Sequence, residues 1–247
     1  MKQAGWIRVG HRGAPREFPG NTLRGFQRAI ELGCEMVECD IRETNDGVIV
    51  LAHDPVVKDS GGNIYSIADT DRATLASLDL GAGEGVPTLQ DLVALANGRC
   101  AIMADMKCEG REIELRVSEA LAPLGIDAKL IPGAGEVSRA RFRQIDPLLP
   151  LSLTLSAQEA ELLSGAGFER LLESLDTAAV TWEHPLLNEE RIAALHFRGV
   201  RVFAWTVDDP SVMNRLITEG VDGIISNRPD LMTSQGSKSG RNGRAEW

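Results

Sequence analysis

The chain has 247 residues, of which 43% are hydrophobic and 25% charged, and its formal net charge is −10. This composition is typical of a globular protein that buries a core. The acidic balance argues against a nucleic-acid partner, which would favour a basic surface, but it does not exclude a small anionic substrate. The length fits one large domain.

The sequence contains no recognisable export or membrane signal. Residues 1–10 lack the apolar core of a signal peptide, and no apolar run approaches the roughly 18 residues that a membrane span needs. We therefore expect a cytoplasmic protein without membrane insertion. The cysteines are not spaced as C-x-x-C pairs, which favours buried, reduced thiols: Cys34, Cys39, Cys100 and Cys108. Residues 236–247 are polar and basic, which predicts a disordered tail.

Short apolar runs alternate with segments of helical period along most of the chain. The first three predicted elements are a strand over 6–9, a helix over 21–32 and a strand over 36–41. Further strands are predicted over 101–106, 128–131, 151–155, 178–182, 200–206 and 223–226, with helices over 89–96, 112–121, 139–145, 157–175, 189–197 and 211–219. This alternation favours a (β/α)8 TIM barrel, although an open doubly wound α/β sheet gives the same pattern. We expect the barrel to form one domain over 1–235.

A hairpin signal breaks this alternation after the second predicted strand. Residues 45–47 read Asn-Asp-Gly and lie between two β-prone runs. In each turn register that this tripeptide allows, His53 comes to lie opposite residue 38, 39 or 40. We therefore expect the hairpin to return His53 to the end of the second strand.

A segment without clear periodicity follows the hairpin. It covers residues 65–86 and contains several glycines, and we expect the whole insertion to span about 54–87. A lid or small subdomain over the barrel mouth is one interpretation, and a plain surface loop is the other.

Two carboxylates lie near the end of the second predicted strand. Glu38 and Asp40 are two residues apart, so their side chains share one face of the strand. Like charges on an otherwise apolar strand are costly without a counter-charge, which a divalent cation that prefers oxygen ligands can supply. The alternative is a solvated strand end whose acids face water. Their predicted proximity to His53 favours the metal site.

A histidine and an arginine end the first predicted strand. His11 lies at the rim where barrel enzymes carry their catalysts, and Arg12 follows it. An imidazole can move protons, and an arginine suits a phosphate oxygen. Two histidines beside two carboxylates therefore predict metal-assisted cleavage of a phosphate ester. The alternatives are a structural histidine and a surface arginine.

Later strand ends add weaker candidates. Asp105 and Lys107 share a face at the end of the third predicted strand, which suggests a third metal ligand and a phosphate clamp, or else a rim ion pair of little energetic value. Trp205 ends the seventh strand and either walls the pocket against the substrate's carbon skeleton or packs in the core. His184 follows the sixth strand and could line the pocket, whereas we expect no role for His196, which lies on a helix.

The order and spacing of these residues resemble those of the glycerophosphodiester phosphodiesterase family. The resemblance spans residues 6–230 and is most specific near the N-terminus. It rests on the motifs His11-Arg12-Gly13, Pro19-Gly20-Asn21-Thr22, Glu38-x-Asp40, Asp46-Gly47, Val50-x-x-His53-Asp54, Pro87-Thr88-Leu89, Trp205-Thr206 and Arg228-Pro229.

This resemblance implies a barrel with an inserted segment, a Mg²⁺ or Ca²⁺ ion, and a small phosphodiester as substrate. The implied reaction is the hydrolysis of glycerophosphodiesters to sn-glycerol 3-phosphate and an alcohol. The implied roles are acid/base catalysis by His11 and His53, metal binding by Glu38, Asp40 and Asp105, and phosphate binding by Arg12 and Lys107.

The chain departs from the family pattern at several positions. Asp105 stands where the family usually has a glutamate, so this ligand is one methylene shorter. Ser226-Asn227 replaces the common Thr-Asp, and Pro132-Gly133 stands where many members carry Ser-Phe. These departures bear on substrate and metal preference more than on the type of reaction.

The same fold also carries other functions. A metal-dependent amidohydrolase would need a His-x-His pair, which the sequence lacks. A barrel that binds a phosphodiester without cleaving it, and a metal phosphodiesterase that acts on a different phospholipid-derived diester, are the remaining alternatives.

Overall fold

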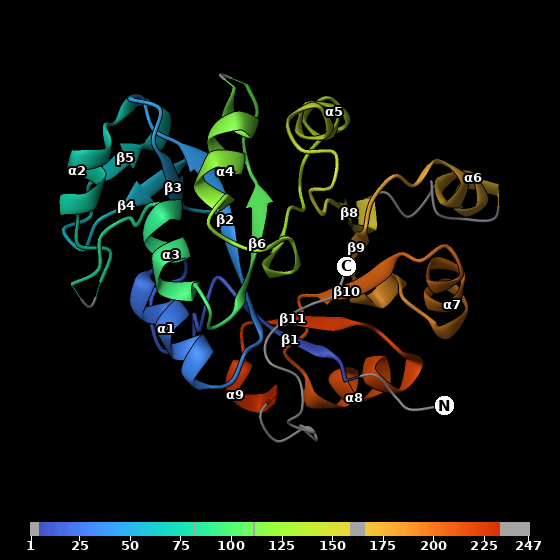
Figure 1. Ribbon diagram of the computed structural model, residues 1–247. Coiled ribbons are helices and arrows are strands. Elements are labelled where there is room, and N and C mark those ends of the chain that lie inside the picture. The colour runs from blue at the N-terminus through green and yellow to red at the C-terminus, as the bar shows by residue number, and fades with distance from the viewer. Residues whose placement is uncertain (1–4, 82, 111, 159–165, 233–247) are drawn as a thin grey trace.

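Eight parallel strands form a nearly closed barrel in the computed structural model, which describes residues 5–81, 83–110, 112–158 and 166–232 (Figure 1). The strands are β1 (Ile7–His11), β2 (Met36–Glu43), β6 (Ala101–Met106), β7 (Lys129–Leu130), β8 (Ser152–Leu155), β9 (Ala179–Glu183), β10 (Arg201–Trp205) and β11 (Gly223–Ser226). They pair in the order β7-β6-β2-β1-β11-β10-β9-β8, and one parallel bridge between Ile131 and Leu151 joins the two ends. The predicted TIM barrel is confirmed.

Helices surround this barrel, as the alternating pattern predicts. They are α1 (Leu23–Glu31), α3 (Leu89–Ala96), α4 (Ile113–Leu121), α5 (Glu136–Ile145), α6 (Ala166–Ser174), α7 (Glu189–Phe197), α8 (Pro210–Glu219) and α9 (Pro229–Met232). The first helix begins later than predicted because Asn21 has a φ of 60° and Thr22 caps the helix by accepting a hydrogen bond from the Gly25 N–H. The predicted helix over 157–175 falls partly on 159–165, which lie outside the described residues, as does the predicted tail over 236–247.

Alternation along the strands separates two apolar cores. One face of each strand packs against the helices, as Val37 and Cys39 do on β2. The opposite face fills the barrel lumen with a second cluster: Val9, Met36, Ala101, Met103, Leu130, Ala179, Phe203 and Ile225. Because the side-chain period is two, the next inward positions lie above this plug, at the carboxyl ends of the strands.

The predicted hairpin is formed by β2 and β3 (Ile49–Leu51). Ile41 pairs with Leu51 in an antiparallel register, and the Ala52 N–H donates to the Asp40 carbonyl over 3.0 Å. Extended by two residues, this register places residue 53 opposite residue 39. The sequence predicted residue 38, 39 or 40 at this position. The backbone of His53 therefore returns to the level of the two carboxylates.

The insertion that follows contains regular structure. It includes the antiparallel pair β4 (Val56–Lys58) and β5 (Ile64–Ser66), a 3-10 turn (Ile67–Asp69) and α2 (Arg72–Ser77). A separate small apolar cluster anchors this insertion to the hairpin: Val50, Ala52, Ile67, Leu75, Leu78 and Val86. The segment is therefore a small folded unit and not a plain surface loop.

Two further expectations concern the chain as a whole. The four cysteines are free thiols, and Cys34, Cys39 and Cys100 are buried. Within the described residues, no helix is both long and apolar enough to cross a bilayer.

Candidate active site

The barrel mouth carries polar side chains directly above the apolar lumen. Val9, Met36 and Met103 fill the lumen, and the residues two positions later on the same strands are His11, Glu38 and Asp105. Asn227, Thr181 and Trp205 follow Ile225, Ala179 and Phe203 in the same way. The alternation of the strands thus brings side chains that are distant in sequence to one face of the barrel.

Three carboxylates converge at this mouth. Glu38, Asp40 and Asp105 each offer an oxygen, and the three oxygens lie within 4.8 Å of one another. Glu38 is 3% and Asp40 0% exposed. Burial, followed by the charges of Asp40 and Asp105, raises the pKa of the Glu38 carboxyl well above its ordinary range. Burial also raises the pKa of Asp105, against the lowering effect of Lys107. Three carboxylates this close together are stable in their charged form only if cations lie beside them.

Two basic side chains compensate part of this negative charge. Arg12 Nε lies 3.0 Å from Asp40 Oδ2, and the Arg12 N–H donates to Glu38 Oε2 over 2.9 Å. Lys107 Nζ lies 2.6 Å from Asp105 Oδ2 and 3.3 Å from Asp40 Oδ1. Both cations therefore lie within reach of an anionic group held beside the carboxylates.

Asn21 fixes the orientation of the most deeply buried acid. Its side-chain Nδ2 donates to Asp40 Oδ2 over 2.8 Å, and its Oδ1 accepts from the Asp40 N–H over 3.1 Å. Asn21 can make both contacts because it adopts the left-handed conformation noted above, just before α1. The sequence motif Pro-Gly-Asn-Thr contained this residue, but its spacing alone did not predict a role for it.

The carboxylates fit a divalent cation that prefers oxygen ligands. Asp40 Oδ1 is buried and accepts no hydrogen bond, although Lys107 Nζ lies near it. A buried oxygen without a hydrogen bond is costly, and a cation would use it as a ligand. The three ligands that the described residues offer are carboxylate oxygens, the donors that Mg²⁺ and Ca²⁺ favour.

The two predicted histidines flank this cluster. His11 Nδ1 lies 2.7 Å from Asn227 Oδ1, and His11 Nε2 lies 3.8 Å from Glu38 Oε2. Burial, followed by the charge of Arg12, lowers the pKa of His11, while the contact with Asn227 opposes that shift. The ring of His11 therefore spans from Asn227, directly after β11, to the acidic cluster.

The second histidine is more open to solvent. The side chain of His53 is 44% exposed, and its Nδ1 lies 2.8 Å from Asp54 Oδ1. Hydrogen bonding to His53 lowers the pKa of the Asp54 carboxyl. Both Nε and Nη2 of Arg42 donate to the His53 carbonyl, at 2.9 and 2.6 Å, which holds this residue beside the end of β2.

The opposite half of the mouth carries hydroxyl and aromatic groups. Thr154 Oγ1 lies 2.9 Å from Thr181 Oγ1 and accepts from the Gly133 N–H over 3.0 Å. Trp205 packs partly against the lumen cluster, and its buried Nε1 has no hydrogen-bond partner among the described residues. The three carboxylates, Arg12, Lys107 and His53 lie on the other side, at the ends of β1, β2 and β6 and after the hairpin strand β3.

The remaining two histidines make no contact with the three carboxylates among the described residues. In the part of the chain that the structure describes, no hydrogen bond or ion pair joins the His184 side chain to the three carboxylates. His196 Nε2 lies 2.8 Å from Asp222 Oδ2, just before β11, at the opposite end of the barrel. This position agrees with the expectation that His196 has no role at the mouth.

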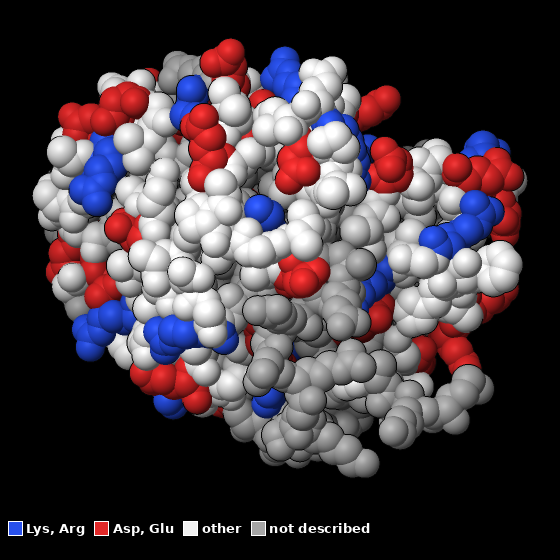
Figure 2. All heavy atoms as spheres, in the orientation of Figure 1, with Lys and Arg blue, Asp and Glu red and all other residues white. Residues whose placement is uncertain are grey.

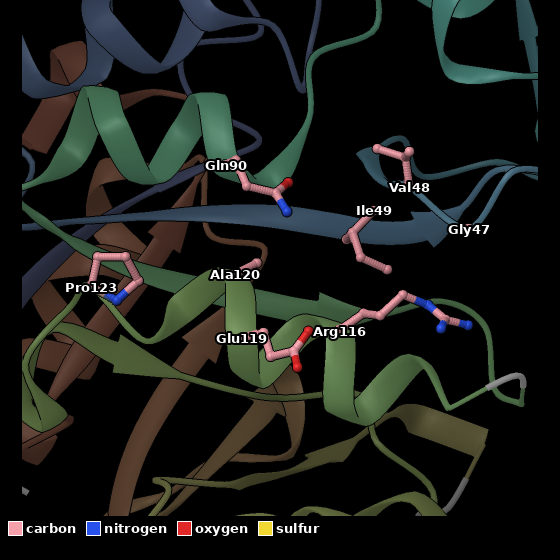
Figure 3. A pocket seen from close by; sticks show the side chains of 8 residues that line it. All are labelled: Gly47, Val48, Ile49, Gln90, Arg116, Glu119, Ala120 and Pro123. Carbon is pink, nitrogen blue, oxygen red and sulfur yellow. The ribbon is translucent and has the colours of Figure 1, made fainter.

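One surface groove lies away from the barrel mouth. A groove of about 360 Å³ lies beside the hairpin turn, α3 and α4, and it is lined by Gly47, Val48, Ile49, Gln90, Arg116, Glu119, Ala120 and Pro123 (Figure 3). None of these residues belongs to the barrel mouth. On the face seen in Figure 2, the Lys and Arg side chains are interspersed with Asp and Glu.

Comparison with known proteins identifies the family. The family model of the glycerophosphoryl diester phosphodiesterases matches residues 11–231. A probable glycerophosphodiester phosphodiesterase 2 of Mycobacterium tuberculosis is 30% identical, with 94% of this chain and 91% of that protein covered. A glycerophosphodiester phosphodiesterase of Caldanaerobacter subterraneus is 29% identical over 94% of this chain and 98% of its own length.

Solved structures agree with this assignment. A phosphodiesterase of Oleispira antarctica, in complex with the product sn-glycerol-3-phosphate, superposes with a TM-score of 0.82 and 25% identity, covering 94% of this chain and 97% of that one. A Thermotoga maritima glycerophosphodiester phosphodiesterase has the same fold, with a TM-score of 0.78 and 22% identity, covering 94% and 99%. With the family match spanning nearly all of the barrel, this chain belongs to the glycerophosphoryl diester phosphodiesterase family.

Proposed function

We propose that this protein hydrolyses glycerophosphodiesters to sn-glycerol 3-phosphate and an alcohol. The observation that carries the proposal is the buried cluster of Glu38, Asp40 and Asp105, flanked by two histidines and two cationic side chains. The Oleispira relative, which binds the product sn-glycerol-3-phosphate, supports this choice of substrate. Free, buried cysteines support a reducing compartment, and a cytoplasmic location stays our prediction.

In this proposal the three carboxylates hold one divalent cation, Mg²⁺ or Ca²⁺. When bound, such an ion neutralises charge on the phosphoryl group and polarises its P–O bonds. Asn21 keeps the Asp40 carboxylate oriented for this purpose through its paired hydrogen bonds.

The chain's own side chains provide the remaining functions. Arg12 and Lys107 bind the phosphate oxygens, because both cations lie at the edge of the acidic cluster. His11 and His53 move protons, one accepting from the attacking hydroxyl and the other donating to the leaving alkoxide. Trp205 packs against the carbon skeleton of the substrate.

A metal-dependence experiment tests the proposal. Glu38→Gln removes one ligand charge but keeps the shape of the side chain, so it should abolish tight Mg²⁺ binding in calorimetry and turnover of glycerophosphocholine. The matched control is Glu43→Gln, because Glu43 lies on the same strand but pairs with Arg116 outside the mouth. This control should keep both properties.

The outcomes separate the competing functions. Full activity in excess chelator would overturn the metal-dependent mechanism. Tight binding of glycerophosphodiesters by the metal-loaded wild type without turnover would instead identify a binding barrel. Turnover confined to another phospholipid-derived diester would contradict the proposed substrate.

A further inference from the structure

A chain of polar contacts runs from the loop after β10 to the ring of His11. The Asp208 carboxylate accepts from the Asn227 N–H (2.8 Å, Oδ1), from Ser226 Oγ (3.0 Å, Oδ1) and from Asn227 Nδ2 (2.9 Å, Oδ2). The other end of the Asn227 amide, Oδ1, lies 2.7 Å from His11 Nδ1. The amide of Asn227 therefore lies between a carboxylate and an imidazole.

The chemistry of these groups determines how the amide is oriented. An ionised carboxylate only accepts hydrogen bonds, so the NH₂ group of Asn227 must face Asp208. The carbonyl oxygen of Asn227 then faces His11, and a carbonyl oxygen also only accepts. The proton of neutral His11 must therefore reside on Nδ1. The lone pair is left on Nε2, the nitrogen that points toward Glu38 and the acidic cluster.

We infer that Asp208, acting through Asn227, fixes the proton of His11 on Nδ1 and so makes His11 Nε2 the proton acceptor of the site. Because the reaction needs one acceptor and one donor, His53 is then the donor to the leaving alkoxide. Asp208 is a positioning residue, since its contacts reach the reacting groups only through Asn227 and His11. The inference rests on the proposed function for the two proton transfers, whereas the position of the proton on His11 does not depend on it.

The environment of His53 suits the donor role. Its Nδ1 lies 2.8 Å from Asp54 Oδ1, a carboxylate oxygen that accepts a hydrogen bond from this nitrogen. His11 has an uncharged amide at the corresponding nitrogen. The two histidines thus differ in the group that faces Nδ1, which is the difference expected for an acceptor and a donor.

A single substitution at Asp208 should reverse the Asn227 amide and move the His11 proton to the other ring nitrogen. In Asp208→Asn, the remaining carbonyl oxygen is needed by the Asn227 N–H, so the new NH₂ group would face the NH₂ group of Asn227. The Asn227 amide should then rotate and present its NH₂ group to His11 Nδ1. His11 would carry its proton on Nε2 and could no longer accept one there.

Exchanging the two side chains should restore the original position of the His11 proton. In the double variant Asp208→Asn/Asn227→Asp, the NH₂ group at position 208 donates to the carboxylate at position 227, which again accepts from His11 Nδ1. The proton of His11 should return to Nδ1, and turnover should recover in part. A purely structural role for Asp208 does not predict this pattern.

The experiment is ¹⁵N NMR of histidine-labelled protein at about pH 8, above the ordinary histidine pKa, with chelator and with Mg²⁺. The chain has 4 histidines, so the His11 signal is assigned by its loss in His11→Gln. His196 provides an internal control for folding, because its contact with Asp222 lies at the other end of the barrel. We expect Nδ1–H in the wild type, Nε2–H in Asp208→Asn and Nδ1–H in the exchanged pair.

Kinetics of the same proteins give the second readout. The kcat of Asp208→Asn should fall by between about 10-fold and about 10⁴-fold with little change in KM, since a positioned proton acceptor is lost. An Nε2–H tautomer in the wild type overturns the inference, as does an unchanged tautomer in folded Asp208→Asn. If the wild type cleaves no glycerophosphodiester, the proposed function fails while the NMR assignment still decides the position of the proton.

Discussion

Asp105 is the most distinctive residue of the acidic cluster, because it is shorter than the glutamate that the family resemblance implies there. Its carboxylate pairs with Lys107 at 2.6 Å. We predict that Asp105→Asn weakens Mg²⁺ and Ca²⁺ binding by at least about tenfold, since even groups behind the ligands commonly contribute that much. Asp105→Glu, which keeps the charge, should retain binding. Calorimetric titration measures both, and an unchanged affinity in Asp105→Asn would reduce Asp105 to a partner of Lys107.

The two histidines at the mouth allow a test of cooperation. His11→Ala and His53→Ala should each lower kcat by about 10²-fold to 10⁴-fold, the usual range for a positioned acid or base. If they act in one reaction, the double variant should lose less than the product of the two single losses. His184→Ala is the control and should keep near-normal turnover. A single variant at position 11 or 53 with wild-type kcat would exclude that histidine from the mechanism.

At the scale of an element, the loop after β7 supports Asp105 through a glycine. Gly133 has a φ of +73°, and a Cβ placed there would collide with Asp105 Oδ1 and lie 2.7 Å from the Met106 carbonyl oxygen. Gly199 has the same φ of +73°, with nothing within 4 Å of such a Cβ. The two positions therefore separate backbone strain from collision with the site.

We predict that Gly199→Ala lowers the free energy of unfolding by about 1 kcal/mol, the cost of left-handed backbone alone. Gly133→Ala should lower it further and should also weaken Mg²⁺ binding, because Asp105 must move. Urea unfolding and calorimetry check these two effects. Equal losses of stability with unchanged metal affinity would mean that Asp105 can move at no cost.

Strand and hairpin elements could be predicted because their patterns are local. The period of two placed Glu38 and Asp40 on one face, and Asn-Asp-Gly fixed the hairpin closely enough to bring His53 back to their level. Eight alternating units likewise predicted the barrel that the structure contains. In each case the pattern is local to one strand, one turn or one strand–helix unit, and the barrel follows from its repetition.

Other parts of the site could not be predicted because they depend on distant pairing or on very short elements. The contact between His11 and Asn227 joins residues 216 positions apart and exists only because β11 pairs with β1. The strands β4 and β5 have three residues each, too few to show a period. The role of Gly133 appears only when β7 is placed beside β6.

At the scale of the whole molecule, one ion pair at the bottom of the barrel predicts a pH dependence of stability. Hydrogen bonding to Asp222 raises the pKa of His196, against a smaller effect of burial. The stabilisation of the folded state by this ion pair should therefore be fully present below the unfolded histidine pKa of about 6.5. It should be lost as the pH rises through the higher pKa of the folded state.

Urea unfolding of the wild type and His196→Gln at about pH 6 and about pH 9 measures this contribution. The stability difference between the two proteins should be larger at the lower pH. His184→Gln is the matched control with the opposite sign, because burial lowers the pKa of His184. A His196→Gln difference that does not change with pH would contradict the role of the ion pair.

The grouping of the proposed phosphate-handling residues on one side of the barrel mouth has a consequence for how such a protein can acquire new substrates. The proposed phosphate-handling groups come from β1, β2, β6 and the hairpin, whereas Thr154, Thr181 and Trp205 come from β8, β9 and β10. Loop exchange after β8 and β9 can therefore reshape the space for the departing alcohol while the phosphate chemistry is inherited intact, whereas the loop after β10 must keep Asp208. Evolution, and a directed library, can search for new head groups in one half of the chain without rebuilding the other.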